Sequence, residues 1–230
     1  MAENSVLNYR GRKTSRARSE QRRRAILEAA LRIVVRDGVR GVRHRAVARE
    51  AGVPLSATTY YFDDISALIA DTFTLFAETA IREVVQPIYQ YLADWIHQHQ
   101  QEMQGAIVSD QLLDELAALI VNLVQQELTE NRQHLLAEQA FKHECLRDAG
   151  LRAVAQTYFD HLLEGLVALC RHIQVDDPDT AGELLMGTVF RIEHEALMVP
   201  VEDFDAAKAR RMIRRLLAGF LPIAGPLPRN

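Results

Sequence analysis

Hydrophobic positions recur at helical spacing along almost the whole chain, and no segment shows the strict alternation that is typical of strands. Between about residue 19 and Gly38, apolar residues that include Ile26, Ala30 and Ile33 share one face of a predicted helix. Gly38 can adopt the left-handed conformation that ends a helix. Residues 1–18 carry no apolar period, so we expect a disordered tail before this helix.

Three further helices are predicted at short intervals after the first. The second covers about residues 45–51 and is followed by Gly52, and the third covers about 55–62. The Asp63-Asp64 pair comes next and is suited to capping a fourth helix, which runs to about residue 85. Short helices joined by a glycine-containing turn are typical of a helix-turn-helix, whose last helix enters the DNA major groove.

The rest of the chain, about 87–221, has only helical periodicity, and its breaks coincide with proline, glycine, threonine and acidic residues. The breaks fall near Pro87 and Gly105, at 129–130, 148–150 and 176–178, and at Pro200 and Pro222. The predicted fold class is therefore all-α, with an N-terminal three-helix head of the helix-turn-helix type and a larger helical body. The expected domain limits are 1–18 for the basic tail, 19–65 for the head and 66–222 for the body.

Composition places the chain among ordinary globular proteins, with 48% hydrophobic and 25% charged residues. No apolar run reaches the roughly 18 residues that a membrane-spanning helix needs, so we expect no membrane partner. The polar, basic N-terminus lacks the apolar stretch of a secretory signal. Cys145 and Cys170 have neither metal-site nor disulfide-framework spacing. A reducing cytoplasm is the expected location.

The net charge of −4 conceals a strong asymmetry along the chain. Residues 1–50 contain 14 Lys or Arg and 5 Asp or Glu, a net charge of +9, whereas residues 51–230 contain 13 and 26, a net charge of −13. This distribution indicates a polyanion-binding element at the N-terminal end and a body that avoids polyanions. Charge alone leaves open the alternative of a merely solvated basic tail.

The sequence contains little evidence of an active site. His97 and His99 are two residues apart, which puts them on different helix faces, and His143-Glu144 lacks the second histidine of a zinc-binding HExxH motif. The chain has no Walker loop, no dinucleotide-binding glycine pattern and no nucleophile elbow. We therefore expect no enzyme activity, no cofactor and no metal site.

The segment Arg43–Leu68 resembles the DNA-binding domain of the TetR (tetracycline-repressor-like) family. The resemblance rests on Val47-Ala48, on Ala51-Gly52-Val53, on Thr59-Tyr60-Tyr61-Phe62 and on Leu68. The helix that contains Ile26 to Leu31 and the following Asp37-Gly38 also stand where that family has its first helix and turn. The resemblance covers about residues 18–75, and the rest matches only in length and in being all-helical.

This resemblance implies a homodimeric transcriptional regulator that binds a double-stranded DNA operator and responds to a small-molecule effector. Repression is the commoner outcome in the family. Two residues depart from the family pattern. Arg43 stands where a threonine often caps the second helix, and it can contact phosphate but cannot cap. Ile65 stands where a lysine often reaches the DNA backbone, so that contact is expected to be absent.

The candidate DNA contacts come from the second and third predicted helices. Hydroxyl groups can bond to base edges, tyrosines suit phosphates, and arginines can bind phosphates or enter the minor groove. The set is Arg43, His44, Arg45, Leu55, Ser56, Thr58, Thr59, Tyr60 and Tyr61, and Arg22, Arg23, Arg24 and Arg49 are further phosphate candidates. For Tyr60 and Tyr61 the alternative is packing in the core of the head, and for any single arginine it is a solvated surface position.

Aromatic and carboxylate positions in the body are candidates for an effector pocket. The set is Phe73, Phe76, Trp95, Leu116, Ile120, Phe141, Tyr158 and Glu193. For each aromatic residue, plain core packing is the competing interpretation. Glu193 lies on an apolar stripe, where a carboxylate needs a partner such as Arg191 or a cationic ligand; a rim or interface position is the alternative.

The helices predicted at about 150–174 and 178–198 carry more apolar surface than one core face requires. In the TetR family the corresponding pair forms a four-helix interface in the homodimer, and two-fold symmetry suits a palindromic operator. A large monomeric core is the alternative interpretation. At the level of function two alternatives also stay open. One is a helical ligand-binding or interaction module whose basic end contacts an acidic protein and not DNA, and the other is a helical enzyme.

Overall fold

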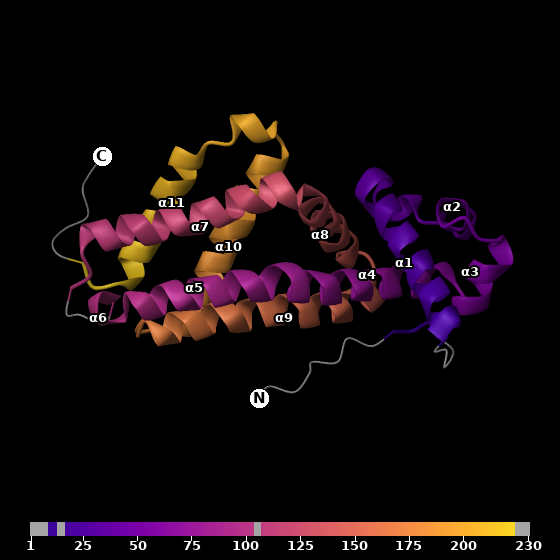
Figure 1. Cartoon of the computed structure of the whole chain (residues 1–230), viewed down its shortest axis with the longest axis horizontal. Helices are drawn as coiled ribbons and strands as arrows, with labels where there is room; N and C mark the ends of the chain where they lie inside the picture. Colours follow the sequence, from indigo (N-terminus) through magenta and orange to yellow (C-terminus); the bar gives the residue numbers. More distant parts are fainter. Residues whose placement is uncertain (1–8, 13–16, 104–106, 224–230) are drawn as a thin grey trace. The chain divides into compact units, whose positions relative to one another are not determined.

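A computed structural model describes residues 9–12, 17–103 and 107–223, and these residues are helical almost throughout. The helices run in the order α1 (Ala17–Asp37), η1 (Val39–Gly41), α2 (His44–Glu50), α3 (Leu55–Tyr61), α4 (Ile65–Ala80), η2 (Ile81–Val85), α5 (Gln86–Gln98), α6 (Gln100–Met103), α7 (Asp110–Glu130), α8 (Arg132–Cys145), α9 (Ala149–His172), α10 (Pro178–Leu197), η3 (Val201–Asp203) and α11 (Ala206–Phe220) (Figure 1). One isolated bridge joins Val108 to Ile223. The predicted all-α fold class is confirmed.

The chain forms two compact units. The first takes the described residues up to Glu83 together with Leu136–Phe159. The second takes the described residues of Val84–Leu135 and those from Asp160 onward. The limits of the units therefore fall inside η2, α8 and α9.

In the first unit, α1 supplies the apolar face that its sequence pattern predicts. Ile26, Ala30 and Ile33 are buried, and α1 packs against α2 and α4. The helix ends at Asp37, and Gly38 follows with a φ of 73°, a conformation that residues with a Cβ rarely adopt. The predicted end of the first helix is confirmed.

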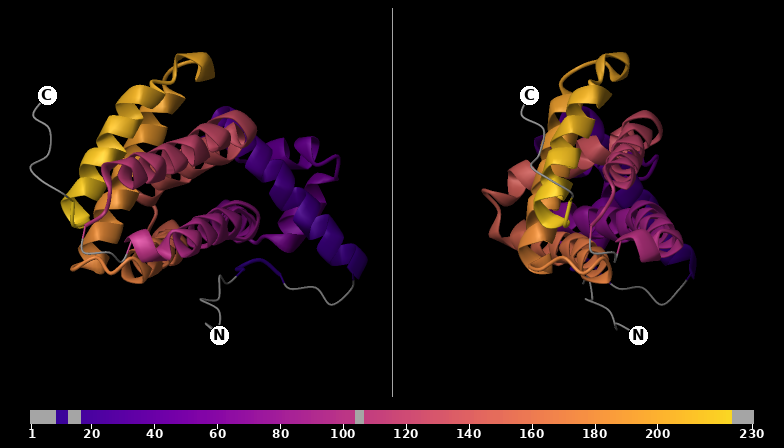
Figure 2. Two further views of the ribbon diagram at one scale, coloured as in Figure 1. Left: turned by 60° about the vertical axis from the view of Figure 1, so that its left-hand side comes forward. Right: turned by 90° about the vertical axis from the view of Figure 1, so that its left-hand side faces the viewer.

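In the second unit, α7, α10 and α11 pack on one another. Leu113 and Val121 of α7 and Ile213 of α11 are fully buried in the shared core. Both views in Figure 2 show α11, in yellow, beside α10, in orange. The core of this unit is therefore made from amphipathic helices, each of which keeps a polar face outside.

Two glycines set close helix approaches in the second unit. A Cβ on Gly165 of α9 would lie 2.0 Å from a ring carbon of Tyr89 on α5, and one on Gly182 of α10 would lie 2.7 Å from a methyl carbon of Val167 on α9. The Tyr89 hydroxyl donates to the carbonyl of Leu162 at 2.6 Å. These approaches fix α5 and α10 against the C-terminal half of α9.

The fourth helix differs from its prediction at the C-terminal end. A continuous helix to about residue 85 is expected, but α4 ends at Ala80 and a π-helical segment, η2, follows before α5. Pro87 lies in the first turn of α5. Proline has no N–H to donate to the carbonyl four residues back, and its ring pushes that carbonyl away, which explains the locally widened helix. Over the described residues, no helix is both long and apolar enough to cross a membrane.

The N-terminal tail also differs from its prediction. A disordered segment is expected over residues 1–18, yet Tyr9–Arg12 makes defined contacts and α1 already begins at Ala17. Gly11 is buried, and its N–H bonds to a side chain of α4. The lack of an apolar period does not lead to disorder here, because backbone N–H groups hold the segment on Asp71 and every residue type except proline carries such a group. Residues 1–8 and 13–16 lie outside the described residues.

Candidate nucleic-acid interface

A tight turn joins α2 to α3 and sets the angle between them. Gly52 has a φ of 64°, which favours glycine, and the N–H of Val53 donates to the carbonyl of Ala48 at 3.0 Å. Ala48 is buried between the helices, where its small side chain allows close packing. This is the geometry of a helix-turn-helix, with α3 in the position of the recognition helix.

The α3 helix divides its side chains between the core and the surface. Thr58 and Tyr61 are buried: the Thr58 hydroxyl donates to the carbonyl of Leu55, and the Tyr61 hydroxyl lies 2.8 Å from Ser19 Oγ. Thr59 and Tyr60 are exposed, Tyr60 by 51%. The outward face of α3 therefore consists of Leu55, Ser56, Thr59 and Tyr60.

Buried side chains cannot reach base edges, so Thr58 and Tyr61 do not belong to the surface that faces a nucleic acid. Phe62 is fully buried and anchors the end of α3 in the core. The spacing of α3 residues is visible in the sequence, but which of two adjacent tyrosines points inward depends on the packing of α3 against its neighbours.

Several arginines on α1, on α2 and at the N-cap of α2 are exposed. Arg43 is the N-cap residue of α2 in extended conformation, and in the described structure no side-chain hydrogen bond caps that helix end. Arg45 and Arg49 on α2 and Arg22 on α1 are exposed, and His44 is half-buried.

Arg23 and Arg24 have structural partners. Arg23 is buried and pairs with Glu20 and with Asp71 of α4, both at 3.1 Å, which removes it from the phosphate candidates. Arg24 pairs with Glu28 on the surface of α1.

The start of α4 carries negative charge beside the interface. Asp64 is the N-cap residue, and its carboxylate accepts from the N–H of Ala67 at 2.7 Å. The predicted capping by the aspartate pair is therefore confirmed for Asp64. Ile65 is half-buried at the first helical position and brings no positive charge there.

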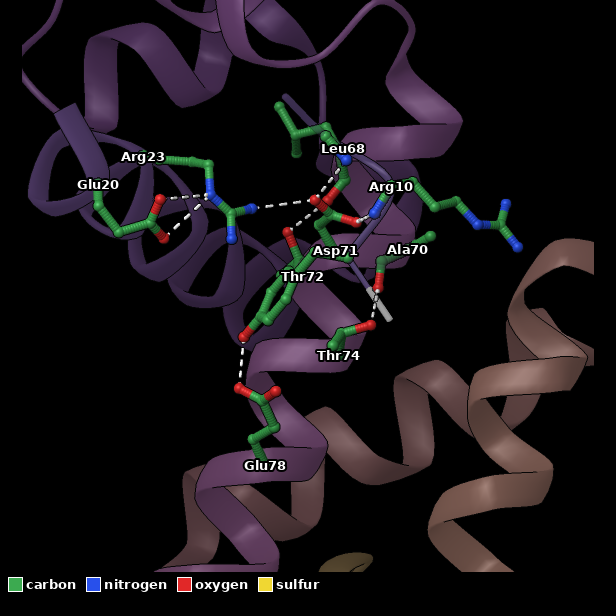
Figure 3. Close-up of polar contacts among 11 residues, drawn as sticks. Arg10, Glu20, Arg23, Leu68, Ala70, Asp71, Thr72, Thr74 and Glu78 are labelled. Carbon is green, nitrogen blue, oxygen red and sulfur yellow. Dashed lines mark hydrogen bonds and ion pairs between the residues drawn. The ribbon is translucent and has the colours of Figure 1, made fainter. Parts of the chain in front are cut away.

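Asp71 of α4 is the centre of a buried polar network that the sequence prediction missed (Figure 3). Its carboxylate accepts from the N–H groups of Arg10 at 2.5 Å and Gly11 at 2.8 Å and from the Arg23 guanidinium at 3.1 Å. Burial raises the pKa of the Asp71 carboxyl, and the two N–H groups and Arg23 oppose this shift. The sequence does carry a signal for this site, because Asp71 is a carboxylate within the apolar run of α4 and a buried carboxylate needs partners.

The predicted effector residues of the first unit form one aromatic cluster. Phe73 and Phe141 stack with ring centroids 4.4 Å apart, and Phe76 and Tyr158 complete the group. The Tyr158 hydroxyl donates to the buried carboxylate of Glu138 at 3.0 Å. All four rings are buried, so in this conformation they act as core.

The predicted effector residues of the second unit are spread over α5, α7 and α10. Leu116 and Ile120 of α7 are in the core, Glu193 of α10 is buried, and Trp95 of α5 stacks on His99 at 4.2 Å. A surface depression of about 190 Å³ is lined by parts of α10, η3 and α11, including Glu195, Phe204 and Lys208. It contains none of the predicted residues and is smaller than the usual ligand pocket of about 300 Å³ or more.

The predicted dimer helices expose apolar side chains. On α10, Leu184 is 48% exposed, and Met198, directly after the helix, is 68% exposed. Phe190 of α10 and Leu166 of α9 are half-buried. This surface belongs to the second unit.

Comparisons with known proteins agree with this geometry. Residues 111–219 match the family model of the tetracyclin repressor-like, C-terminal domain. Similar solved structures include SCO1917 of Streptomyces coelicolor A3, a member of the TetR family, with 24% identity, a TM-score of 0.59 and coverage of 88% of this chain and 99% of that chain. The multidrug binding protein EbrR complexed with proflavin has 25% identity, a TM-score of 0.56 and coverage of 85% and 99%. The comparison with curated proteins gave no match.

The fold and the exposed α3 define a helix-turn-helix protein with an all-helical body. Residues 111–219 are therefore similar to the C-terminal domain of tetracyclin repressor-like proteins, and the fold of the chain is similar to that of solved TetR-family structures. TetR-family proteins bind DNA as dimers and bind small-molecule ligands, and they are generally not enzymes.

Proposed function

We propose that this chain is a transcriptional repressor that binds a palindromic DNA operator as a homodimer and is released by a small-molecule effector. In this proposal residues 19–65 bind DNA, and residues 66–222 bind the effector and form the dimer. The observation that carries the proposal is the outward face of α3, with its hydroxyl groups and exposed Tyr60, together with the exposed Arg43 and Arg45 at the start of α2, the helix that packs against α3. Hydroxyl groups suit base edges and arginines suit phosphates.

The α3 helix itself carries no arginine, asparagine or glutamine, so the strongest bidentate base contacts do not come from this helix. We infer that Ser56 and Thr59 contribute modest base readout, and that the arginines supply most of the affinity. Binding is then strongly dependent on salt, because each neutralised phosphate releases counterions.

The first experiment selects bound duplexes from a random pool with the purified full-length protein at two salt concentrations. We expect a palindromic site with half-sites about one helical turn, roughly 34–36 Å, apart. Arg45→Ala and Thr59→Ala are each expected to weaken binding to that site by about fivefold to tenfold. Arg211→Ala is the matched control, because Arg211 is an exposed arginine of α11. Failure to enrich any duplex at low salt would favour the interaction-module alternative.

The effector is proposed to be a small molecule that binds the helical body. EbrR has been solved in complex with proflavin, with ethidium and with malachite green. The identity to this chain is 25% for the first two structures and 24% for the third. These compounds are therefore the first probes. A ligand shifts the protein away from DNA only if it binds the DNA-incompatible conformation more tightly than the DNA-compatible one.

The effector test follows on the selected operator. Proflavin and ethidium also intercalate into DNA, so calorimetric titration of the protein alone comes first. A probe that binds is then added to the protein–operator complex, and we expect dissociation that depends on protein-bound probe. Binding without any change in operator affinity would contradict release by that probe.

A further inference from the structure

The segment Tyr9–Arg12 bridges several elements of the first unit, and we call it the clasp. Its two central N–H groups bond to Asp71 of α4. The Tyr9 hydroxyl donates to Glu78, two turns further along the same helix, and the Arg10 side chain donates to the carbonyl of Gly150 at the start of α9. Figure 3 shows the backbone N–H of Arg10 and the guanidinium of Arg23 reaching Asp71 from different elements, while the Arg10 side chain points away.

Gly11 is required by this arrangement. A Cβ at this position would lie 2.8 Å from Asp71 Oδ2 and 2.8 Å from a ring carbon of Phe62. Both residues are fully buried, so neither can move aside cheaply. The clasp is therefore a packed site that is built around one glycine, one carboxylate and one aromatic ring.

Arg12 is placed by the same contacts at the outward face of α3. Its N–H donates to the carbonyl of Tyr61 at 2.9 Å, and its guanidinium lies over the ring of Tyr60 at 4.6 Å from the centroid. Both Arg12 and Tyr60 are exposed. The N–H groups of a guanidinium lie in its plane, so stacking on an aromatic ring leaves them available to a phosphate or a base edge.

We propose that Arg12, held over Tyr60, is an additional contact to duplex DNA, and that Gly11 and Asp71 are positioning residues that present it. This inference rests on the proposed DNA-binding function. The clasp thus supplies a cation that α3 lacks, at a defined position over the exposed ring of Tyr60. Pre-ordering by the clasp reduces the entropy that Arg12 loses when it binds.

The test measures affinity for the selected operator across a range of salt concentrations. Arg12→Ala is expected to weaken binding by about fivefold and to reduce the slope of log affinity against log salt by about 1. Arg211→Ala should leave both quantities unchanged. Arg12→Lys is expected to keep most of the salt slope but lose part of the affinity, because an ammonium does not stack as a planar group.

A double-mutant cycle tests the positioning role. Gly11→Ala alone should weaken operator binding about as much as Arg12→Ala, whereas adding Gly11→Ala to Arg12→Ala should cost little more. A purely structural role would give additive losses. If Gly11→Ala does not fold by circular dichroism, Asp71→Asn replaces it in the cycle, because an amide of similar shape provides a weaker acceptor for the clasp.

The outcomes separate this inference from the function on which it rests. If the wild type binds the operator and Arg12→Ala binds it equally well, the Arg12 contact alone is overturned. Additive losses in the cycle would overturn the positioning role. Failure of the wild type to bind any duplex would overturn both the inference and the proposed function.

Discussion

At the scale of single residues, burial decides the chemistry that each side chain can perform. Two tyrosines adjacent in the sequence have opposite roles, because Tyr61 packs inside while Tyr60 is half exposed. Two adjacent arginines differ in the same way, since Arg23 is buried on Asp71 while Arg22 is exposed. Residue type alone predicts a set of candidates, and burial selects among them.

The two cysteines give a prediction at this scale. Burial raises the pKa of Cys145 to about 11 and also raises that of Cys170. Because the thiolate is the reactive form, the native thiols should be unreactive at neutral pH; relative to the ordinary value of 9.0, the Cys145 thiolate is about a hundredfold rarer. The measurement is thiol titration with Ellman's reagent at pH 7.5.

Unfolding in concentrated urea provides the control, in which both thiols of the chain should react promptly. As the pH is raised toward 11, reaction of the native protein should accelerate, since the folded thiol of Cys145 begins to ionise there. Rapid reaction of the native protein at neutral pH would contradict the burial of both side chains.

At the scale of elements, capping and proline set where the helices begin and end. The aspartate of α4 caps its helix, α10 and α11 begin at the capping side chains of Asp177 and Asp205, and the π-helical η2 precedes Pro87. These features are local, so most of them can be read from the sequence. The exception is η2, because a proline predicts a disturbance of the helix but not its form.

The α4 cap gives a prediction at this scale. Asp64→Ala should lower the free energy of unfolding by about 1 kcal/mol, because the N–H of Ala67 loses its acceptor. Asp63→Ala is the matched control: the residue is exposed, adjacent and of equal charge, but it does not cap the helix. Urea unfolding followed by circular dichroism measures both variants. Equal losses would mean that charge at the helix start, and not the cap bond, is responsible.

At the scale of the whole molecule, charge and apolar surface are distributed unevenly along the chain. The N-terminal 50 residues have a net charge of +9, and the remaining residues have a net charge of −13. Exposed apolar side chains remain on and beside α10, where a monomer gains nothing from them. Both features fit a dimeric regulator whose basic heads bind a duplex.

The proposed dimer gives a prediction at this scale. Leu184→Glu should raise the dimer dissociation constant by more than about tenfold, because it places a charge in an apolar interface. Leu146→Glu serves as the control, since Leu146 is 75% exposed and lies outside the proposed interface helices. Analytical ultracentrifugation over a range of protein concentrations measures the equilibrium. A monomeric wild type, or an equal effect of both substitutions, would argue against this interface.

Helix positions, fold class and the helix-turn-helix are determined by the sequence on its own, because they depend on periodicity, on Gly38 and Gly52, and on side chains that act within one turn. The resemblance of residues 43–68 to the TetR family is also visible in the sequence, because its motif residues lie at fixed spacing within one short segment. Only the tertiary structure decided which α3 residues face outward and that Asp71 binds the backbone of Gly11, 60 residues away. Such contacts join segments distant in sequence, and no local pattern records them.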